Sequence, residues 1–192
     1  MDTLKITKAD LNERNEYAVA DSLEFRGSVE VEANLGVVRI RGRAIVVGAL
    51  SVNAGSSLEV GGSLKVGSSL EVGGSLEVGS SLEVGWSLEV GESLEVGAWL
   101  EVGAWLEVGG SLKVGESLEV GWSLKVGGSL KVGLSITAKW ISCEFRIFAG
   151  LCDWKIPSPE EMRINAEVRK GIVCFGEVMK PEITTKKKVA DA

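Results

Sequence analysis

Between Leu58 and Ile136 the sequence repeats every six residues, and this period constrains the fold more than any other feature. Fourteen hexads fit without a gap, and each reads Ser, Leu, Glu or Lys, Val, Gly and one variable residue. Leu and Val lie two positions apart, so in an extended strand both point to one side and the residue between them to the other. A helix is excluded, because this spacing scatters apolar residues around its 3.6-residue wheel and each glycine would cost roughly 1 kcal/mol.

The three-residue Leu-x-Val strands are too short to hold hairpins, and turn pairs such as Asn-Gly are missing from the repeats. The pattern therefore predicts an all-β fold, a parallel β-solenoid with glycines at corners where backbone angles or crowding disfavour a side chain. Trp86, Trp122 and Trp140, together with Ala104, would form one column if a coil holds three hexads. We predict a triangular prism of about 18 residues per coil. Its handedness stays open, and we favour a left-handed coil.

The flanks keep the same triplet at irregular spacing, for example in Leu23-Glu-Phe25 and Leu50-Ser-Val52. We expect an N-terminal cap at residues 1–22, the solenoid at 23–138 with regular hexads at 57–138, a small β-rich C-terminal cap or interaction segment at 139–180, and a disordered tail at 181–192. Pro157 and Pro159 predict a turn between two longer strands. Residues 158–161, Ser-Pro-Glu-Glu, have the form of a helix-start box, but the alternation after them favours a strand.

Composition removes several classes of function. The 192 residues contain no histidine, which excludes Ser-His and Cys-His nucleophile pairs, imidazole bases and most catalytic zinc sites. We expect no catalytic residues, metal or cofactor. Cys143, Cys152 and Cys174 are odd in number and lack C-x-x-C spacing, so reduced thiols are expected. The N-terminus has no secretory apolar run and no stretch reaches 18 apolar residues, so we expect a soluble, cytoplasmic protein with no membrane partner.

The unit Val78-Gly79-Ser80-Ser81-Leu82-Glu83 resembles the hexapeptide motif of left-handed β-helix proteins, and about 14 hexads carry the resemblance. Leu82 departs from that family, which prefers a small residue there, and so implies a wider core. With a larger residue at this position, the repeat resembles that of bactofilin-like proteins, which polymerise end to end without nucleotide. The chain also looks like Gly-rich hexad-repeat proteins of phages and prophages. Many left-handed members are acyltransferases that use a histidine base. With no histidine in the chain, that activity is not implied.

Glutamate dominates the outward slot of the hexad. From Gly55 to Ala138 there are 11 Glu and 4 Lys, a net charge of −7, so the rest of the chain sums to +1. A coil of three hexads stacks six Glu pairs, and at about 5 Å each costs roughly 0.8 kcal/mol in water before salt screening. Three carboxylates per coil approach the charge density of duplex DNA, about one per 1.7 Å. The candidate partner-binding carboxylates belong to Glu71, Glu77, Glu83, Glu89, Glu95, Glu101 and Glu107.

Four tryptophans, Trp86, Trp99, Trp105 and Trp122, occupy variable or pre-Leu slots, which the alternation places at corners or outside. Exposed tryptophans often mark contacts. In a coil of three hexads Trp86, Trp105 and Trp122 share one corner and form an aromatic ridge. The alternative is that they cover the glycine corners or pack a subunit interface.

These features predict a non-enzymatic binding protein, of phage-inhibitor or DNA-mimic type, that presents its Glu columns and ridge to a basic surface such as that of a nucleic-acid-binding protein. Net acidity disfavours direct nucleic-acid binding. Two alternatives stay open. The chain could be a self-assembling scaffold of bactofilin-like type, and a homo-oligomer is expected in either case. The glutamates could also serve only to keep a regular β surface soluble.

Overall fold

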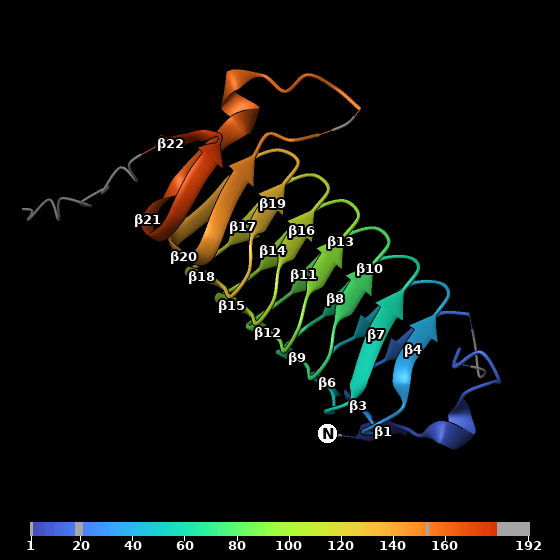
Figure 1. Cartoon of the computed structure of the whole chain (residues 1–192). Helices are drawn as coiled ribbons and strands as arrows, with labels where there is room; N and C mark the ends of the chain where they lie inside the picture. Colours follow the sequence, from blue (N-terminus) through green and yellow to red (C-terminus); the bar gives the residue numbers. More distant parts are fainter. Residues whose placement is uncertain (1, 18–20, 153, 180–192) are drawn as a thin grey trace, which may run out of the picture.

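The computed structural model describes residues 2–17, 21–152 and 154–179. The chain is a parallel β-solenoid of about nine turns with about 18 residues per regular turn, which confirms the predicted fold class. The turns stack side by side along one axis, from the N-terminus to the last strands of the chain (Figure 1). The tail expected at residues 181–192 lies outside the described residues.

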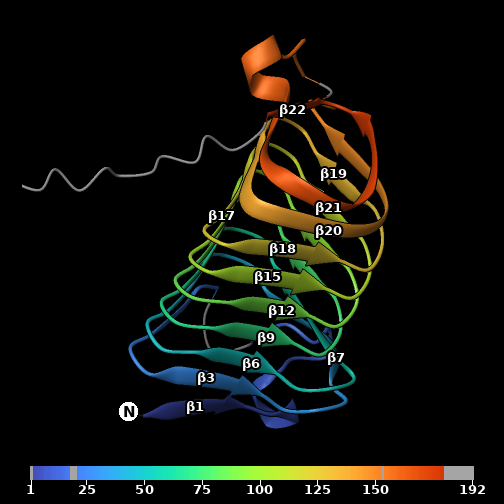
Figure 2. The same ribbon diagram turned by 90° about the vertical axis from the view of Figure 1, so that its left-hand side faces the viewer.

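The strands form three faces, each a ladder of parallel strands from successive turns. Face 1 contains β1 (Thr3–Ile6), β3 (Ser28–Val31), β6 (Leu50–Val52), β9 (Leu70–Val72), β12 (Leu88–Val90), β15 (Trp105–Val108) and β18 (Ser123–Val126). Face 2 contains β4 (Gly36–Ile40), β7 (Ser56–Val60), β10 (Leu76–Val78), β13 (Leu94–Val96), β16 (Leu112–Val114) and β19 (Leu130–Val132). Face 3 contains β2 (Leu23–Phe25), β5 (Ala44–Val46), β8 (Leu64–Val66), β11 (Leu82–Val84), β14 (Leu100–Val102) and β17 (Leu118–Val120). Figure 2 shows the ladder of face 1 from β1 upward.

The core is a continuous column of Leu and Val from all three faces. The Leu and Val of every hexad strand are buried, whereas the Glu or Lys between them is half-buried or exposed. From β7 to β16 each strand pairs in register with the strand three hexads later, Leu on Leu and Val on Val, as Leu82 does on Leu100. Burying these side chains supplies the main driving force for folding, at roughly 1.5–3 kcal/mol each.

The hexad glycines are required by crowding and not by backbone angle. A Cβ on Gly97 would lie 2.1 Å from the carbonyl oxygen of Gly79, one turn earlier, and the other corner glycines of the hexads meet backbone in the same way. Among the described residues, the glycines with positive φ lie outside the hexads, at Gly36, Gly55, Gly150, Gly171 and Gly176. Glycine therefore sets how closely successive turns approach at a corner.

The spiral extends into the segment that we assigned to the N-terminal cap. β1 pairs in parallel with β3, from Thr3 on Ser28 to Ile6 on Val31. After the 3₁₀ turn η1 (Lys8–Asp10), a short antiparallel bridge joins Leu11 to Tyr17, and Tyr17 donates its amide to the Arg39 carbonyl of β4. Leu11 and Tyr17 pack against the end of the core. The first segment is thus an irregular turn that also covers the open end.

The C-terminal segment continues the spiral with longer strands. β20 (Ile136–Ala149) runs over β17, β18 and β19, and β21 (Arg163–Phe175) runs over β20, with β22 (Glu177–Met179) above the start of β21. The expected longer strands are therefore present. The helix-start box also forms, because Glu161 accepts a hydrogen bond from the Ser158 amide, but it starts only the 3₁₀ turn η2 (Pro159–Met162) before the strand begins.

Candidate functional site

The outward slots of the hexads form three straight columns of charge. Because Glu77 pairs with Glu59 and Glu95, Glu89 with Glu71 and Glu107, and Glu101 with Glu83 and Glu119, all six expected Glu stacks are confirmed. Each face thus carries three carboxylates in succession, spaced by one turn of about 4.8 Å. Like charges directly opposite in a ladder are destabilising.

Four of the six column ends meet a cation, and these pairs were not predicted from the sequence. On face 2 Arg39 bonds Glu59 at 2.7 Å and Lys113 bonds Glu95 at 2.5 Å. On face 3 Lys65 bonds Glu83 at 2.6 Å. On face 1 Lys125 pairs with Glu107, and this hydrogen bond raises the pKa of Lys125. The signal that could have found these pairs is the spacing of three hexads, which applies to Lys as well as to Glu.

Five glutamates lack such a partner. Among the described residues, no ion pair involves the carboxylates of Glu71, Glu77, Glu89, Glu101 or Glu119. Of these, Glu77, Glu89 and Glu101 are the middle members of the three columns, one on each face. Four of the six column ends are thus paired with a cation, whereas the three middle carboxylates and those of Glu71 and Glu119 have no ion pair in the described chain.

Three of the candidate tryptophans meet at the corner between faces 3 and 1, which we call the tryptophan corner (residues 85–87, 103–105 and 121–123). Trp86 and Trp122 share one slot with Ala104 between them, because the Ala104 amide donates to the Trp86 carbonyl and the Trp122 amide to the Ala104 carbonyl. Trp105 lies in the next slot, opposite Ser123. Trp86 is 62% exposed, Trp122 57% and Trp105 40%. The predicted aromatic ridge is therefore present and open to solvent.

One expected member of the column is displaced. Trp140 lies opposite Ser123 and not in the slot of Trp122, so the prediction of one column of Trp86, Trp122 and Trp140 is wrong in that position. The cause is that the turn made by β20 is one residue shorter, since Leu124 pairs with Ile141. Lys139 takes the slot above Trp122 instead, where its amide donates to the Trp122 carbonyl.

Trp122 and Trp140 each carry a cation from the following turn. The ammonium of Lys139 lies 3.7 Å from the centre of the Trp122 ring, and the guanidinium of Arg169 lies 4.7 Å from that of Trp140. Both distances are within the range of cation–π attraction. In the described chain no cation lies over Trp86 or Trp105.

Trp99 lies apart from the other candidate tryptophans. It occupies the corner between faces 2 and 3, is 39% exposed, and lines a shallow cavity of about 320 Å³ with Arg43, Ile45, Lys65 and others of face 3. Arg43 pairs with Glu24, and Lys65 with Glu83. The structure thus places Trp99 outside the ridge, as its spacing predicts.

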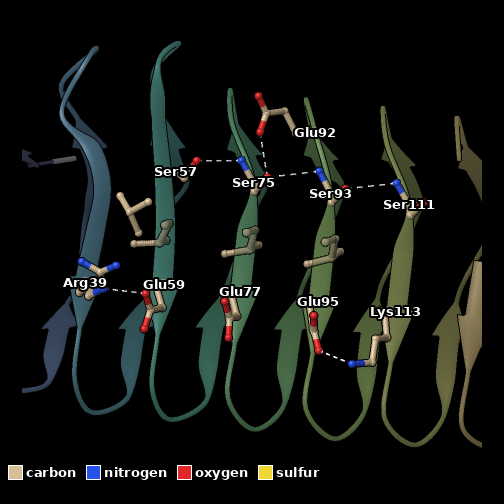
Figure 3. A pocket seen from close by; sticks show the side chains of 14 residues that line it. Arg39, Ser57, Glu59, Ser75, Glu77, Glu92, Ser93, Glu95, Ser111 and Lys113 are labelled. Atoms are coloured by element: carbon tan, nitrogen blue, oxygen red, sulfur yellow. Dashed lines mark hydrogen bonds and ion pairs between the residues drawn. The ribbon is translucent and has the colours of Figure 1, made fainter.

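A second, larger groove of about 710 Å³ follows face 2 (Figure 3). One row consists of serines, in which the Ser75 amide donates to the Ser57 hydroxyl and each later amide to the preceding hydroxyl. The other row is the face 2 column from Arg39 to Lys113. The serine hydroxyls are used by the neighbouring turns, so this groove is a consequence of the repeat.

Among the described residues, no group of three or more Cys, Asp or Glu is placed to hold a metal ion. Burial raises the pKa of the Cys143 thiol, while Glu161 of the acidic pair at 160–161 bonds Lys155 and Ser158, which lowers its pKa. No helix in the described ranges has the length and hydropathy of a membrane span.

The sequence analysis missed an exposed apolar surface at the C-terminal end. Phe145, Ile172, Phe175, Val178 and Met179 are all exposed, Ile172 at 67%. β22 covers β21 only from Arg163 to Asn165. A signal was available in the run of apolar residues at 172–175, which breaks the alternation expected of a strand with one face in solvent.

The comparisons with known proteins leave the site to be interpreted from its geometry, since no protein family, curated protein or solved structure matches this chain.

Proposed function

We propose that this chain is a non-enzymatic binding protein that presents the tryptophan corner, with the Glu columns of faces 1 and 3 on either side, to a basic surface of another protein. The observation that carries the proposal is the placement of exposed Trp86 between two columns whose middle members, Glu89 and Glu101, have no ion pair within the described chain. Aromatic anchors beside charges of one sign are typical of protein interfaces and steer partners of opposite charge.

The chemistry of the partner follows from this charge. Where all three outward slots of a turn hold Glu, the charge density, three carboxylates per turn of about 4.8 Å, approaches that of duplex DNA. The partner class that we propose is therefore a nucleic-acid-binding protein, and the chain would act as an inhibitor of phage type. The three cysteines are free, which supports a reducing, cytoplasmic location as part of the proposal.

The repeat offers a matched set of variants to test the proposal. Glu89→Lys and Glu101→Lys change the middle of the columns beside the corner, whereas Glu77→Lys makes the same change on face 2. Proteins captured from a cell lysate should be retained by wild type and Glu77→Lys, lost with the other two variants, and displaced by duplex DNA. Equal retention by all three variants would contradict the proposal.

A second candidate function is self-assembly, and the exposed apolar residues of β21 and β22 favour it. Most of β21 has no strand paired on its outer side among the described residues, and such an edge can accept another chain. If the chain is a scaffold, Ile172→Lys should reduce the particle size measured by light scattering, while Glu101→Lys should leave it unchanged. A monomer at all concentrations would remove this candidate.

A further inference from the structure

We infer that Trp86 is an open recognition site for a Lys or Arg side chain of the partner protein, an inference that rests on the proposed function and specifies how the corner would bind. The next tryptophan in the same slot already holds a cation from its own chain. Trp122 is two turns from Trp86, and the ammonium of Lys139 lies 3.7 Å from its ring centre.

The backbone around the two rings is equivalent. Each tryptophan donates its amide to the residue one turn earlier, Trp86 to Ser68 at 3.2 Å and Trp122 to Ala104 at 2.8 Å. The residue above each donates its amide to the tryptophan carbonyl, Ala104 at 2.7 Å and Lys139 at 2.8 Å. Ala104 thus holds, above Trp86, the backbone position that Lys139 holds above Trp122. A methyl group stands where the other site has a cationic side chain.

The charge around Trp86 favours a cation more strongly than the charge around Trp122. Three residues to either side of Trp86 are Glu83 and Glu89, and on the next turn Glu101 and Glu107 hold the same positions. Glu89 and Glu101 have no ion pair in the described chain, whereas Glu83 pairs with Lys65 and Glu107 with Lys125. At about 3.3 Å per residue these carboxylates lie within roughly 10 Å of the corner.

Around Trp122 the equivalent positions hold Glu119 and Lys125, and on the next turn Thr137 and Ser142. A cation from the same chain is therefore held where the field is weak, and the site in the stronger field has none in the described chain.

Trp105 and Trp140, in the neighbouring slot, show the same difference between an open ring and a ring that carries a cation. Trp105 shares its slot with Trp140, whose ring carries the Arg169 guanidinium at 4.7 Å, but the residue above Trp105 is Ser123. Trp86 and Trp105 lie on adjacent turns, about 5 Å apart along the axis. The corner therefore fits a segment with neighbouring cationic side chains, and it accommodates ammonium and guanidinium alike.

The decisive variant is Ala104→Lys, which would supply from within the chain the cation that the partner is inferred to provide. Ala98→Lys is its matched control. Ala98 occupies the same hexad slot at the corner between faces 2 and 3, is half-buried like Ala104, and stacks on Ser80 instead of a tryptophan. Both variants change the net charge by the same amount and differ in their stacked neighbours, which are Trp86 below and Trp122 above position 104 and Ser80 below and Glu116 above position 98. Comparison with Trp86→Leu assigns the difference to the ring below.

Binding is measured by calorimetry with octalysine and octaarginine as probes, and with fully acetylated octalysine as the uncharged reference. We expect Ala104→Lys and Trp86→Leu to weaken binding of the charged peptides roughly 3- to 30-fold relative to Ala98→Lys. Lys139→Ala, which uncovers Trp122, should strengthen it. Circular dichroism verifies the fold, and NMR should show the ε-methylene protons of the lysine introduced at position 104 shifted upfield by the Trp86 ring.

Equal binding by Ala104→Lys and Ala98→Lys overturns the inference. If Glu101→Lys nevertheless binds more weakly than Glu77→Lys, the proposed function survives as a purely electrostatic surface. If those two variants also bind equally, the proposed function fails with it.

Discussion

The hexad region and the two ends of the molecule both consist of stacked parallel strands, but their turns differ in length. From β7 to β16 every strand pairs with its equivalent three hexads later, with Leu on Leu and Val on Val. Toward the N-terminus a turn takes more of the chain, since Gly36 pairs with Ser56 and Leu23 with Ala44. The turn that begins at Ile136 is longer still, because Ile136 pairs with Ile164, and it is followed by a shorter turn in which Arg163 pairs with Glu177.

The glycines show the same contrast. In the hexads they are needed because turns touch, whereas at the ends Gly150, Gly171 and Gly176 have positive φ. In the middle of the molecule the need for glycine therefore comes from contacts between successive turns, whereas at the ends it comes from the local backbone conformation. The C-terminal end also exposes apolar side chains, among them Phe145 and Ile172.

The largest effect is expected from removing core volume in the hexad region. Leu100 is buried between Leu82 and Leu118 of the neighbouring turns, so Leu100→Ala should lower the free energy of unfolding by about 2–5 kcal/mol. Val173→Ala near the C-terminal end, where the side chain is only half-buried, should cost less. Urea unfolding of both variants measures the difference, and an equal loss would show that the ends share the packing of the middle.

Adding a methyl group at a corner should separate crowding from conformation. Gly97→Ala places a Cβ 2.1 Å from the Gly79 carbonyl oxygen, so the turns must move apart, at a cost of about 1–3 kcal/mol. Gly171→Ala meets a positive φ and should perturb only the last turn. Amide exchange mapped along the chain distinguishes them, and Ser80→Ala is the corner control. A local effect of Gly97→Ala would show that adjacent turns are not held by these contacts.

A smaller change of opposite sign is expected from breaking a Glu column. Glu101→Lys replaces two like-charge stacks, with Glu83 and Glu119, by two opposite-charge stacks, and should raise the free energy of unfolding by up to about 1 kcal/mol at low salt. Lys125→Glu should lower it, because it removes the ion pair with Glu107. Thermal unfolding with and without added salt provides the measurement, since roughly half-molar salt screens exposed charges strongly. A loss of stability in Glu101→Lys would contradict the repulsive stack.

The placement of side chains inside or outside the solenoid could be predicted wherever the six-residue period holds. The stacking of residues between turns was predicted wrongly where that period changes. Leu82, Val84 and Glu83 could be assigned to inside and outside because their alternation and the coil of three hexads leave a single arrangement. Trp140 was misplaced because one residue is missing from the β20 turn, and nothing local in the sequence marks that deletion. The cations on Trp122 and Trp140 were missed for the same reason, since Lys139 reaches its slot only after this shift. The exposed apolar surface of β21 depends on what lies beyond the last turn, which a repeat pattern does not specify.

The smallest effect concerns the N-terminal end at acid pH. Arg41 and Asn12 donate hydrogen bonds to the Glu16 carboxylate and lower its pKa from the ordinary 4.5 to about 2. The ionised Glu16 therefore stabilises the folded protein fully at a pH above about 4.5. That contribution should be lost as the pH falls from about 4.5 through 2. The Tyr17 amide, bonded to the Arg39 carbonyl, should then lose protection from exchange, after correction for the intrinsic rate.

In Glu16→Gln the protection of the Tyr17 amide against hydrogen exchange should no longer change between pH 5 and 2. The amides of β13 should keep the same protection over this pH range in both the wild type and the variant. Because β13 lies in the middle of the hexads and pairs with the backbone of both neighbouring turns, its amides provide the reference within the same sample. A wild-type Tyr17 whose protection is as independent of pH as that of Glu16→Gln would mean that backbone pairing, and not the Glu16–Arg41 pair, holds the first turn on the solenoid. The N-terminal end would then obey the same rule as the middle.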